Sequence, residues 1–199
     1  MRRATAPGVG LRREKKKMRN MRVIAGTFKG RRLKAPSWEG LRPTSDKLRE
    51  TLFNILAPRI DGARVLDGYA GTGAIGIEAL SRGASHVAFV ERDRRAQALI
   101  AENLAACGVT NGYAIIRASF DRAVADLPLA SFDLVLLDPP YDHRPEAAIE
   151  RASRVLAANG VLILEHARRQ AAPASSGGLT RTRDVVSGDS ALAFYSCPP

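Results

Sequence analysis

One apolar segment of the sequence ends in four residues whose types suit the handling of a planar amine. Residues 132–137 form a strand-sized apolar run, and Asp138-Pro139-Pro140-Tyr141 follows it directly. The two prolines fix the backbone and remove two N–H donors, so the carbonyl oxygens there are rigidly held acceptors. The Asp138 side chain and the Pro139 carbonyl can bind both hydrogens of an exocyclic amine and turn its lone pair toward an electrophilic methyl. Tyr141 offers a ring face for stacking a base, although a plain Pro-Pro turn is the simpler interpretation of the tetrapeptide alone.

A second segment has the composition of a nucleotide-binding loop. Residues 65–67 read Val-Leu-Asp and lead into the glycine-rich residues 68–76, where backbone N–H groups can approach a ligand beside a helix amino terminus. Gly71, Gly73 and Gly76 also match the G-x-G-x-x-G dinucleotide fingerprint, so a nicotinamide enzyme is an open alternative. Asp67 stands four residues before Gly71. An acid there would repel a pyrophosphate, but it suits a ligand with an ammonium and a sulfonium, namely S-adenosylmethionine.

An acidic residue follows the next apolar run. Glu91 comes after residues 87–90 and 18 residues after Gly73, a position from which a carboxylate can accept both hydroxyls of a ribose. A solvated acid beside Arg92 is the simpler alternative. With this acid, the residues expected to bind S-adenosylmethionine in and around the loop are Asp67, Gly71, Thr72, Gly73 and Glu91.

These motifs lie among alternating strand-like and helix-like segments. Apolar runs buried on both faces, separated by helices, predict an α/β fold with a parallel, doubly wound Rossmann-like sheet. The tail alternates charged and apolar residues around a turn at 187–189, which predicts a final antiparallel hairpin. We expect strands at residues 64–67, 86–91, 113–117, 132–137 and 160–165. We expect helices at residues 43–58, 74–81 and 93–107, and a further helix that carries Ile149, Ala152, Val155 and Leu156. The first of these helices is capped by Thr44 or Ser45 and closed by Pro58.

Basic side chains are concentrated in the first fifth of the chain. The 199 residues carry a formal charge of +11; residues 1–42 have 14 basic and two acidic side chains (+12), and residues 43–199 have 17 and 18 (−1). Residues 1–20 lack apolar periodicity and are predicted to be a disordered arm, whereas residues 21–42 predict a basic β-hairpin that begins a single domain spanning 21–199. The charge favours RNA as a partner. The expected RNA contacts are Arg22, Lys29, Arg31, Arg32, Lys34 and Arg42.

Several classes of protein are disfavoured. Cys107 and Cys197 match no zinc or redox spacing, and the histidines at 86, 143 and 166 match no metal site, so we expect no metal and no disulfide framework. The apolar runs are far shorter than the roughly 20 residues that span a bilayer, and the amino terminus lacks a secretory pattern. We expect a cytoplasmic monomer without a membrane segment.

The combined motifs resemble the bacterial small-subunit rRNA guanine-N2 methyltransferases. The resemblance covers residues 21–197 and rests on residues 22–26 and 30–33, on residues 42–44 and 52–56, on residues 67–83 and on residues 138–141. It implies a seven-stranded class I methyltransferase fold, S-adenosylmethionine as donor, and methylation of one guanine in 16S rRNA in an assembled subunit or intermediate. It places the base-amine motif on Asp138, Pro139, Pro140 and Tyr141. Ser119, where relatives often have an acid, becomes the adenine contact, and Gly68 replaces a larger apolar residue.

Two other functions are compatible with the same residues. The Asp138 tetrapeptide serves any planar amine, so an adenine N6 methyltransferase acting on DNA is the first alternative. An RNA-binding assembly factor that retains the fold without turnover is the second, although both ligand-binding motifs are intact. The nucleoside that acquires the methyl group distinguishes the three.

Overall fold

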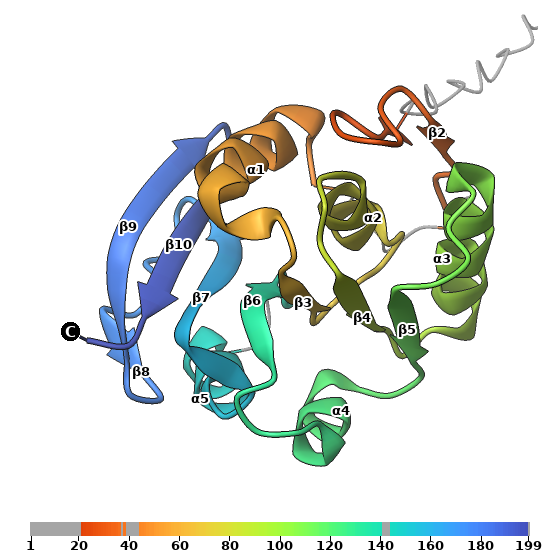
Figure 1. The fold of residues 1–199 in the computed structure, drawn as a ribbon. Helices are drawn as coiled ribbons and strands as arrows, with labels where there is room; N and C mark the ends of the chain where they lie inside the picture. Colours follow the sequence, from red (N-terminus) through yellow and green to blue (C-terminus); the bar gives the residue numbers. More distant parts are fainter. Residues whose placement is uncertain (1–20, 37, 39–43, 141–143, 199) are drawn as a thin grey trace, which may run out of the picture.

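Helices cover both faces of one mixed sheet in the computed structural model, which describes residues 21–36, 38, 44–140 and 144–198 (Figure 1). Residues 1–20, Arg42 and Tyr141, for which the sequence made predictions, lie outside the described residues. The predicted doubly wound α/β fold is confirmed. The elements are β1 (Met21–Arg22), β2 (Arg32–Leu33), α1 (Asp46–Ile60), β3 (Arg64–Asp67), α2 (Ala74–Ser81), β4 (His86–Val90), α3 (Arg94–Cys107), β5 (Tyr113–Ile116), α4 (Phe120–Asp126), β6 (Phe132–Leu137), α5 (Pro145–Ser153), β7 (Leu156–Ala167), β8 (Ser175–Ser176), β9 (Leu179–Ser187) and β10 (Ser190–Ser196).

The strand order locates the place where such a sheet binds ligands. The main sheet runs β5-β4-β3-β6-β7-β10-β9-β8; the first five strands are parallel, and β10 and β9 pair antiparallel. Within this sheet, the chain enters at the central strand β3 and moves outward through β4 to β5. It then crosses back to β6, which lies on the other side of β3. In open α/β sheets, ligands bind outside the carboxyl ends of the strands at this reversal. The two-residue β8 is an eighth strand beyond the seven that the resemblance implies.

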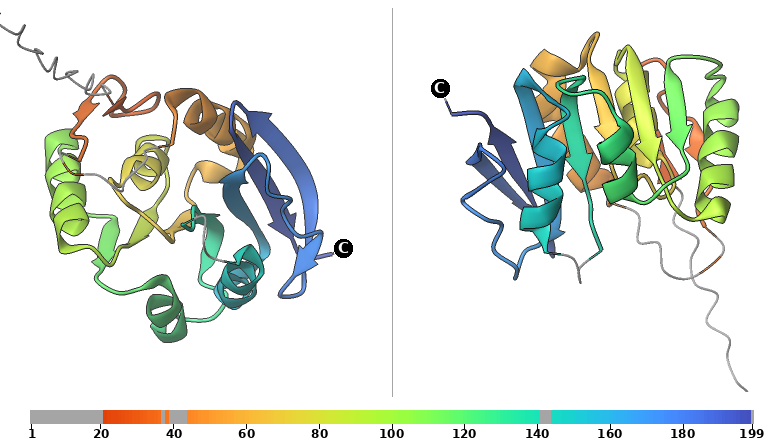
Figure 2. Two further views of the ribbon diagram at one scale, coloured as in Figure 1. Left: turned by 180° about the vertical axis from the view of Figure 1, so that it is seen from behind. Right: turned by 90° about the horizontal axis from the view of Figure 1, so that it is seen from below.

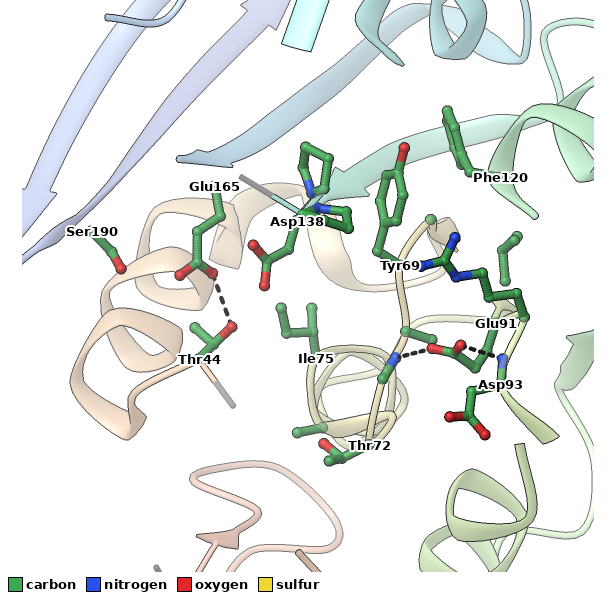
Figure 3. A pocket seen from close by; sticks show the side chains of 18 of the residues that line it. Thr44, Tyr69, Thr72, Ile75, Glu91, Asp93, Phe120, Asp138, Glu165 and Ser190 are labelled. Atoms are coloured by element: carbon green, nitrogen blue, oxygen red, sulfur yellow. Dashed lines mark hydrogen bonds between the residues drawn. The ribbon is translucent and has the colours of Figure 1, made fainter. Parts of the chain in front are cut away.

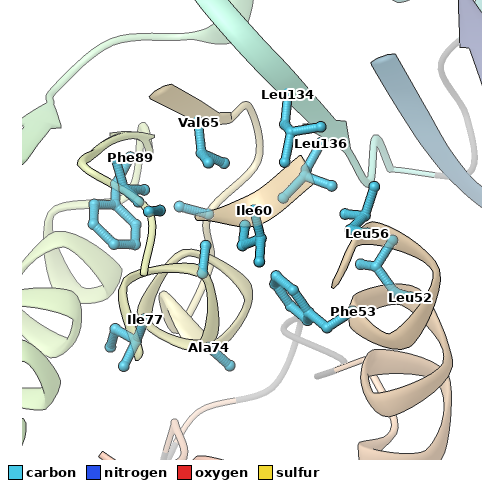
Figure 4. Close-up of a cluster of buried hydrophobic side chains, with 14 of the residues drawn as sticks. Leu52, Phe53, Leu56, Ile60, Val65, Ala74, Ile77, Phe89, Leu134 and Leu136 are labelled. Carbon is cyan, nitrogen blue, oxygen red and sulfur yellow. The ribbon is translucent and has the colours of Figure 1, made fainter. Parts of the chain in front are cut away.

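Two apolar clusters hold the layers together. Helices α1, α2 and α3 cover one face of the sheet, and α4 and α5 cover the other (Figure 2). On the first face, Phe53 and Leu56 of α1 and Ile77 of α2 are buried against strand residues such as Phe89 and Leu134 (Figure 4). This packing holds the amino termini of α1 and α2 at the carboxyl edge of the sheet.

Two predicted elements need correction, and one helix was not predicted. The helix expected to close at Pro58 continues to Ile60, because Ile60 is buried in the core and Pro58 lies in the last turn, where only one helical hydrogen bond is lost. Val155 and Leu156 do not belong to the preceding helix, which ends at Ser153; Leu156 begins the long strand β7. Helix α4 had no predicted counterpart, since its seven residues are too few for a clear period.

Candidate active site

A large cavity opens at the carboxyl ends of β3, β4, β6 and β7. Its volume is about 850 Å³. It brings together seven of the residues that the sequence singled out: Gly71, Thr72, Glu91, Ser119, Asp138, Pro139 and Pro140. Figure 3 shows the side chains of Thr72, Glu91 and Asp138 around the amino terminus of α2.

Asp67 and Gly73 lie behind the cavity rather than in its wall. Asp67 ends β3 with its side chain buried, and its carboxylate accepts a hydrogen bond of 3.0 Å from the backbone N–H of Gly76. Gly73 has a φ of 76° at the N-cap of α2, a conformation that favours glycine. The expected contact of Asp67 with a ligand ammonium therefore does not follow from this geometry. The carboxylate holds the first turn of α2, which follows the loop that carries Gly71 and Thr72.

Burial raises the pKa of Asp67 to about 7, although the hydrogen bond from Gly76 favours the charged form and opposes this. Its ordinary value of 3.8 applies to the unfolded chain. The stability contributed by the protonated group is fully present below that value and is lost as pH rises through about 7.

Asp67→Asn, which keeps an acceptor for Gly76 but cannot ionise, should remove this dependence. Relative to the wild type, we expect the variant to gain up to about 1.4 kcal/mol of stability per pH unit between roughly pH 4 and 7. Urea unfolding at several pH values measures the difference. The exposed Asp126 of α4 supplies the control variant, Asp126→Asn. A difference between Asp67→Asn and wild type that stays constant with pH would contradict the assignment.

Two glycines allow close approaches around the loop. A Cβ at Gly76 would lie 2.2 Å from Cε1 of Phe89, so α2 can seat on β4 only with glycine there. A Cβ at Gly68 would lie 2.8 Å from Leu137 and 2.9 Å from the ring of Phe120. The family pattern has a larger apolar residue at the position of Gly68. Here the ring of Phe120 occupies the space that such a side chain would need, which explains the glycine.

Glu91 joins the glycine loop to the start of α3. One carboxylate oxygen accepts the N–H of Gly71 at 2.9 Å, and the other accepts the N–H of Asp93 at 2.8 Å (Figure 3). Asp93 is in turn the N-cap of α3, as the sequence predicted. A carboxylate has about four lone-pair positions, so Glu91 retains acceptors for a ligand while the backbone holds it in place.

Aromatic side chains form the wall between Glu91 and Asp138. The rings of Tyr69 and Phe120 stack at 4.9 Å with an interplanar angle of 27°, and both line the cavity. Burial raises the pKa of Tyr69 to about 12, so its hydroxyl stays protonated. Ser119, the N-cap of α4, lies beside this pair. The sequence indicated Ser119 but missed Tyr69 and Phe120, because only the fold brings the two rings into contact.

The residues expected to bind the amine follow the end of β6. Asp138 and Pro139 are half-buried and line the cavity, whereas Pro140 is exposed. Asp138 follows Leu137, which is paired with Leu164 of β7. The stacking role expected of Tyr141 remains a prediction.

A second carboxylate at this edge was missed from the sequence. Glu165 follows Leu164 on β7 and lines the same cavity, where its Oε2 accepts the hydroxyl of Thr44 at 2.9 Å. Ser190 of β10 lies nearby (Figure 3). An acid directly after an apolar strand was the pattern that identified Glu91, and the same pattern could have identified Glu165.

The basic hairpin is firmly attached to the helices beside the cavity. The carboxylate of Glu78, on α2, accepts the N–H groups of Ile24 and Ala25 at 2.7 and 3.0 Å. On α3, Asn103 accepts the N–H of Lys34 at 2.7 Å and donates to the carbonyl of Thr72 at 3.0 Å. Asn103 therefore connects the hairpin to the glycine loop.

The hairpin's cations are displayed to solvent. The strands β1 and β2 are only two residues long, shorter than the sequence suggested. Farther along, Trp38 lines the cavity, with the guanidinium of Arg95 4.9 Å from its ring centre. The exposed basic residues are Arg22, Lys29, Arg31, Arg32 and Lys34.

The described residues form neither a metal-binding cluster nor a membrane-spanning helix. Across 21–36, 38, 44–140 and 144–198, no group of three or more His, Cys, Asp or Glu side chains could hold a metal ion. No helix in that part of the chain is long and apolar enough to span a bilayer. Both cysteines are free, Cys107 buried and Cys197 exposed.

Comparisons with known proteins agree with this architecture. The family model described as Conserved hypothetical protein 95 matches residues 21–196. The Escherichia coli K12 protein named ribosomal RNA small subunit methyltransferase D is 34% identical over 183 residues, covering 88% of this chain and 89% of the relative. YlbH of Bacillus subtilis, provisionally named an rRNA methyltransferase, is 38% identical over 180 residues, covering 88% and 98%. The solved structure of Escherichia coli yhhF superposes with a TM-score of 0.77 at 30% identity, covering 88% of this chain and 96% of that one.

The fold and these similarities define a methyltransferase of the Rossmann-like class I type. More particularly, the chain belongs to the family described as Conserved hypothetical protein 95 and resembles methyltransferase D within it.

Proposed function

We propose that this protein transfers a methyl group from S-adenosylmethionine to the N2 amine of a guanine in small-subunit rRNA. The observation that carries the proposal is that one cavity contains both Glu91 and the Asp138-Pro139 acceptors. A nucleoside donor and a flipped base therefore have room in the same pocket. Relatives named for rRNA methylation support the choice of RNA over DNA.

The residues at the Glu91 end fit the donor. Its carboxylate is oriented by two backbone N–H groups and lines the cavity, a suitable arrangement for ribose hydroxyls. Gly71 and Thr72 supply backbone to the methionine part, and Ser119 lies where an adenine contact is expected. When bound, S-adenosylmethionine supplies a methyl group on a positively charged sulfur.

The residues at the Asp138 end orient the acceptor amine. An exocyclic amine is a poor nucleophile, because its lone pair is delocalised into the ring. By accepting the two amine hydrogens, the Asp138 carboxylate and the Pro139 carbonyl hold the nitrogen with its lone pair directed away from them. The nitrogen acquires positive charge as its new bond forms, and the carboxylate of Asp138 stabilises that charge and can accept the surplus proton. No metal or covalent nucleophile is needed for this chemistry.

Donor binding can be measured directly. Calorimetry should show binding of S-adenosylmethionine and of S-adenosylhomocysteine and no binding of NAD. Glu91→Ala should weaken donor binding about 100-fold, because it removes charge-assisted acceptors and releases the Gly71 loop. The exposed Glu50 of α1 gives a control, Glu50→Ala, that should bind normally. Affinity for NAD without affinity for the donor would overturn the assignment.

The acceptor can be identified from the product. Small-subunit particles, naked rRNA and genomic DNA, each from a strain that lacks the enzyme, are incubated separately with protein and labelled donor, and the nucleosides are then mapped by mass spectrometry. One N2-methylguanosine is the expected product. N6-methyladenosine in DNA would support the first alternative, and binding without any methylated nucleoside would support the assembly factor.

A further inference from the structure

The carboxylates of Asp138 and Glu165 belong to neighbouring strands at equivalent heights. Leu137, the last residue of β6, is paired in register with Leu164 of β7, so Asp138 and Glu165 follow at equivalent positions, Asp138 just after β6 and Glu165 within β7. In a parallel pair, residues in register direct their side chains to the same face, and the strands are about 4.8 Å apart. Both residues line the cavity, and Figure 3 shows the Asp138 carboxylate on the side of Ile75 and the Glu165 carboxylate beside Thr44.

Glu165 is held in this position from the side of α1. Its Oε2 accepts the hydroxyl of Thr44, which directly precedes Ser45, the N-cap of α1. The positive end of the helix dipole favours a negative charge close to this turn. A carboxylate offers about four acceptor positions, so a bond from Thr44 and a bond from a base are compatible.

The spacing of two adjacent acceptor groups matches one edge of guanine. Its N2 amine has the N1–H donor as its neighbour, whereas the N6 amine of adenine is next to an N1 lone pair. A carboxylate beside the amine-binding acceptors would accept guanine N1–H and would repel the lone pair of adenine N1. Sites built to bind a donor strongly reject analogues that lack it, because the buried acceptor loses its partner.

We propose that Glu165 is the specificity-determining residue that accepts guanine N1–H while Asp138 and Pro139 hold the N2 amine. This inference rests on the proposed function and extends it from an amine in general to guanine in particular. It assigns to Glu165 a contact with the base in addition to its bond to Thr44.

Exchanging the base and the side chain together tests the contact. Once the methylated guanine is mapped, 2-aminopurine is placed there by ligation of a synthetic oligonucleotide. This base keeps the amine but presents a lone pair at N1. Glu165→Gln can donate its amide N–H to that lone pair. We expect kcat/KM on guanine to fall about 30-fold or more, and the preference for guanine over 2-aminopurine to fall at least about tenfold. The missing O6 of 2-aminopurine affects both enzymes and cancels in this comparison.

Two controls separate recognition from structural support. Thr44→Val removes the hydroxyl bond but keeps the carboxylate, so the preference for guanine should stay within about twofold of wild type even if overall activity falls. Glu150→Gln, at an exposed position on α5, should match wild type in both measurements. If Thr44→Val changes the preference as much as Glu165→Gln does, Glu165 only anchors α1 and the inference is wrong.

The inference and the proposed function fail in different ways. If the wild type methylates no guanine in any rRNA or particle, the proposed function is wrong. If it methylates guanine but Glu165→Gln keeps the wild-type preference over 2-aminopurine, only the inference about Glu165 is wrong. A selective loss of preference in Glu165→Gln supports both.

Discussion

Asp138→Ala should lower kcat by about 100-fold or more while leaving the affinity for S-adenosylmethionine close to normal. The substitution removes one of two acceptors that align the amine, and this interaction strengthens as the nitrogen becomes positive in the transition state. The donor contacts proposed for Glu91 and Gly71 lie after β4 and in the β3–α2 loop, so the change at the end of β6 should not disturb them.

A graded series makes this result specific. Asp138→Asn keeps one acceptor oxygen in the same place but loses the charge, and it should therefore retain more activity than Asp138→Ala. Single-turnover rates on particles measure the chemical step, and calorimetry measures donor affinity. An Asp138→Ala enzyme with wild-type turnover would refute the mechanism, whereas equal loss of turnover and donor binding would place Asp138 in the donor site.

Neutralising Arg31, Arg32 and Lys34 together should weaken rRNA binding by about 100-fold at moderate salt. Each lost phosphate contact removes a counterion-release contribution, so the slope of log affinity against log salt should become less steep by up to roughly two to three units. The hairpin is fixed to α2 by Glu78 and to α3 by Asn103. Rigid charges position a substrate as well as attract it, so kcat/KM should fall with affinity.

Two comparisons locate the docking surface. Removal of residues 1–20 should weaken rRNA binding and reduce its dependence on salt. It should lower turnover less than neutralising the three hairpin residues does, because residues 1–20 are expected only to raise the local concentration of RNA. Replacing the exposed arginines 122, 154 and 183, which lie away from the hairpin on α4, after α5 and on β9, changes the charge equally and should have little effect. Normal methylation by the hairpin variant, with loss after removal of residues 1–20, would reverse the assignment.

The sequence by itself determined the parts of this protein whose chemistry is local. The strand leading to Asp138 and Pro139, the glycine loop before α2 and the acid at the end of β4 are contiguous, so period, proline and glycine constraints predicted them correctly. The N-cap of α3 at Asp93 was predicted for the same reason, because a cap and the N–H groups it binds are neighbours in sequence.

Only the tertiary structure decided which of these residues meet. It placed Asp67 behind the cavity wall, stacked Tyr69 on Phe120 and brought Glu165 beside Asp138, and none of these three placements was predicted from the sequence. Such contacts depend on strand order and register, which are set by how helices and strands bury their apolar faces together. A sequence pattern records which face of a helix or strand is apolar, but it does not record which distant element covers that face. The cavity forms where these distant elements pack together, so it could not be predicted from the pattern.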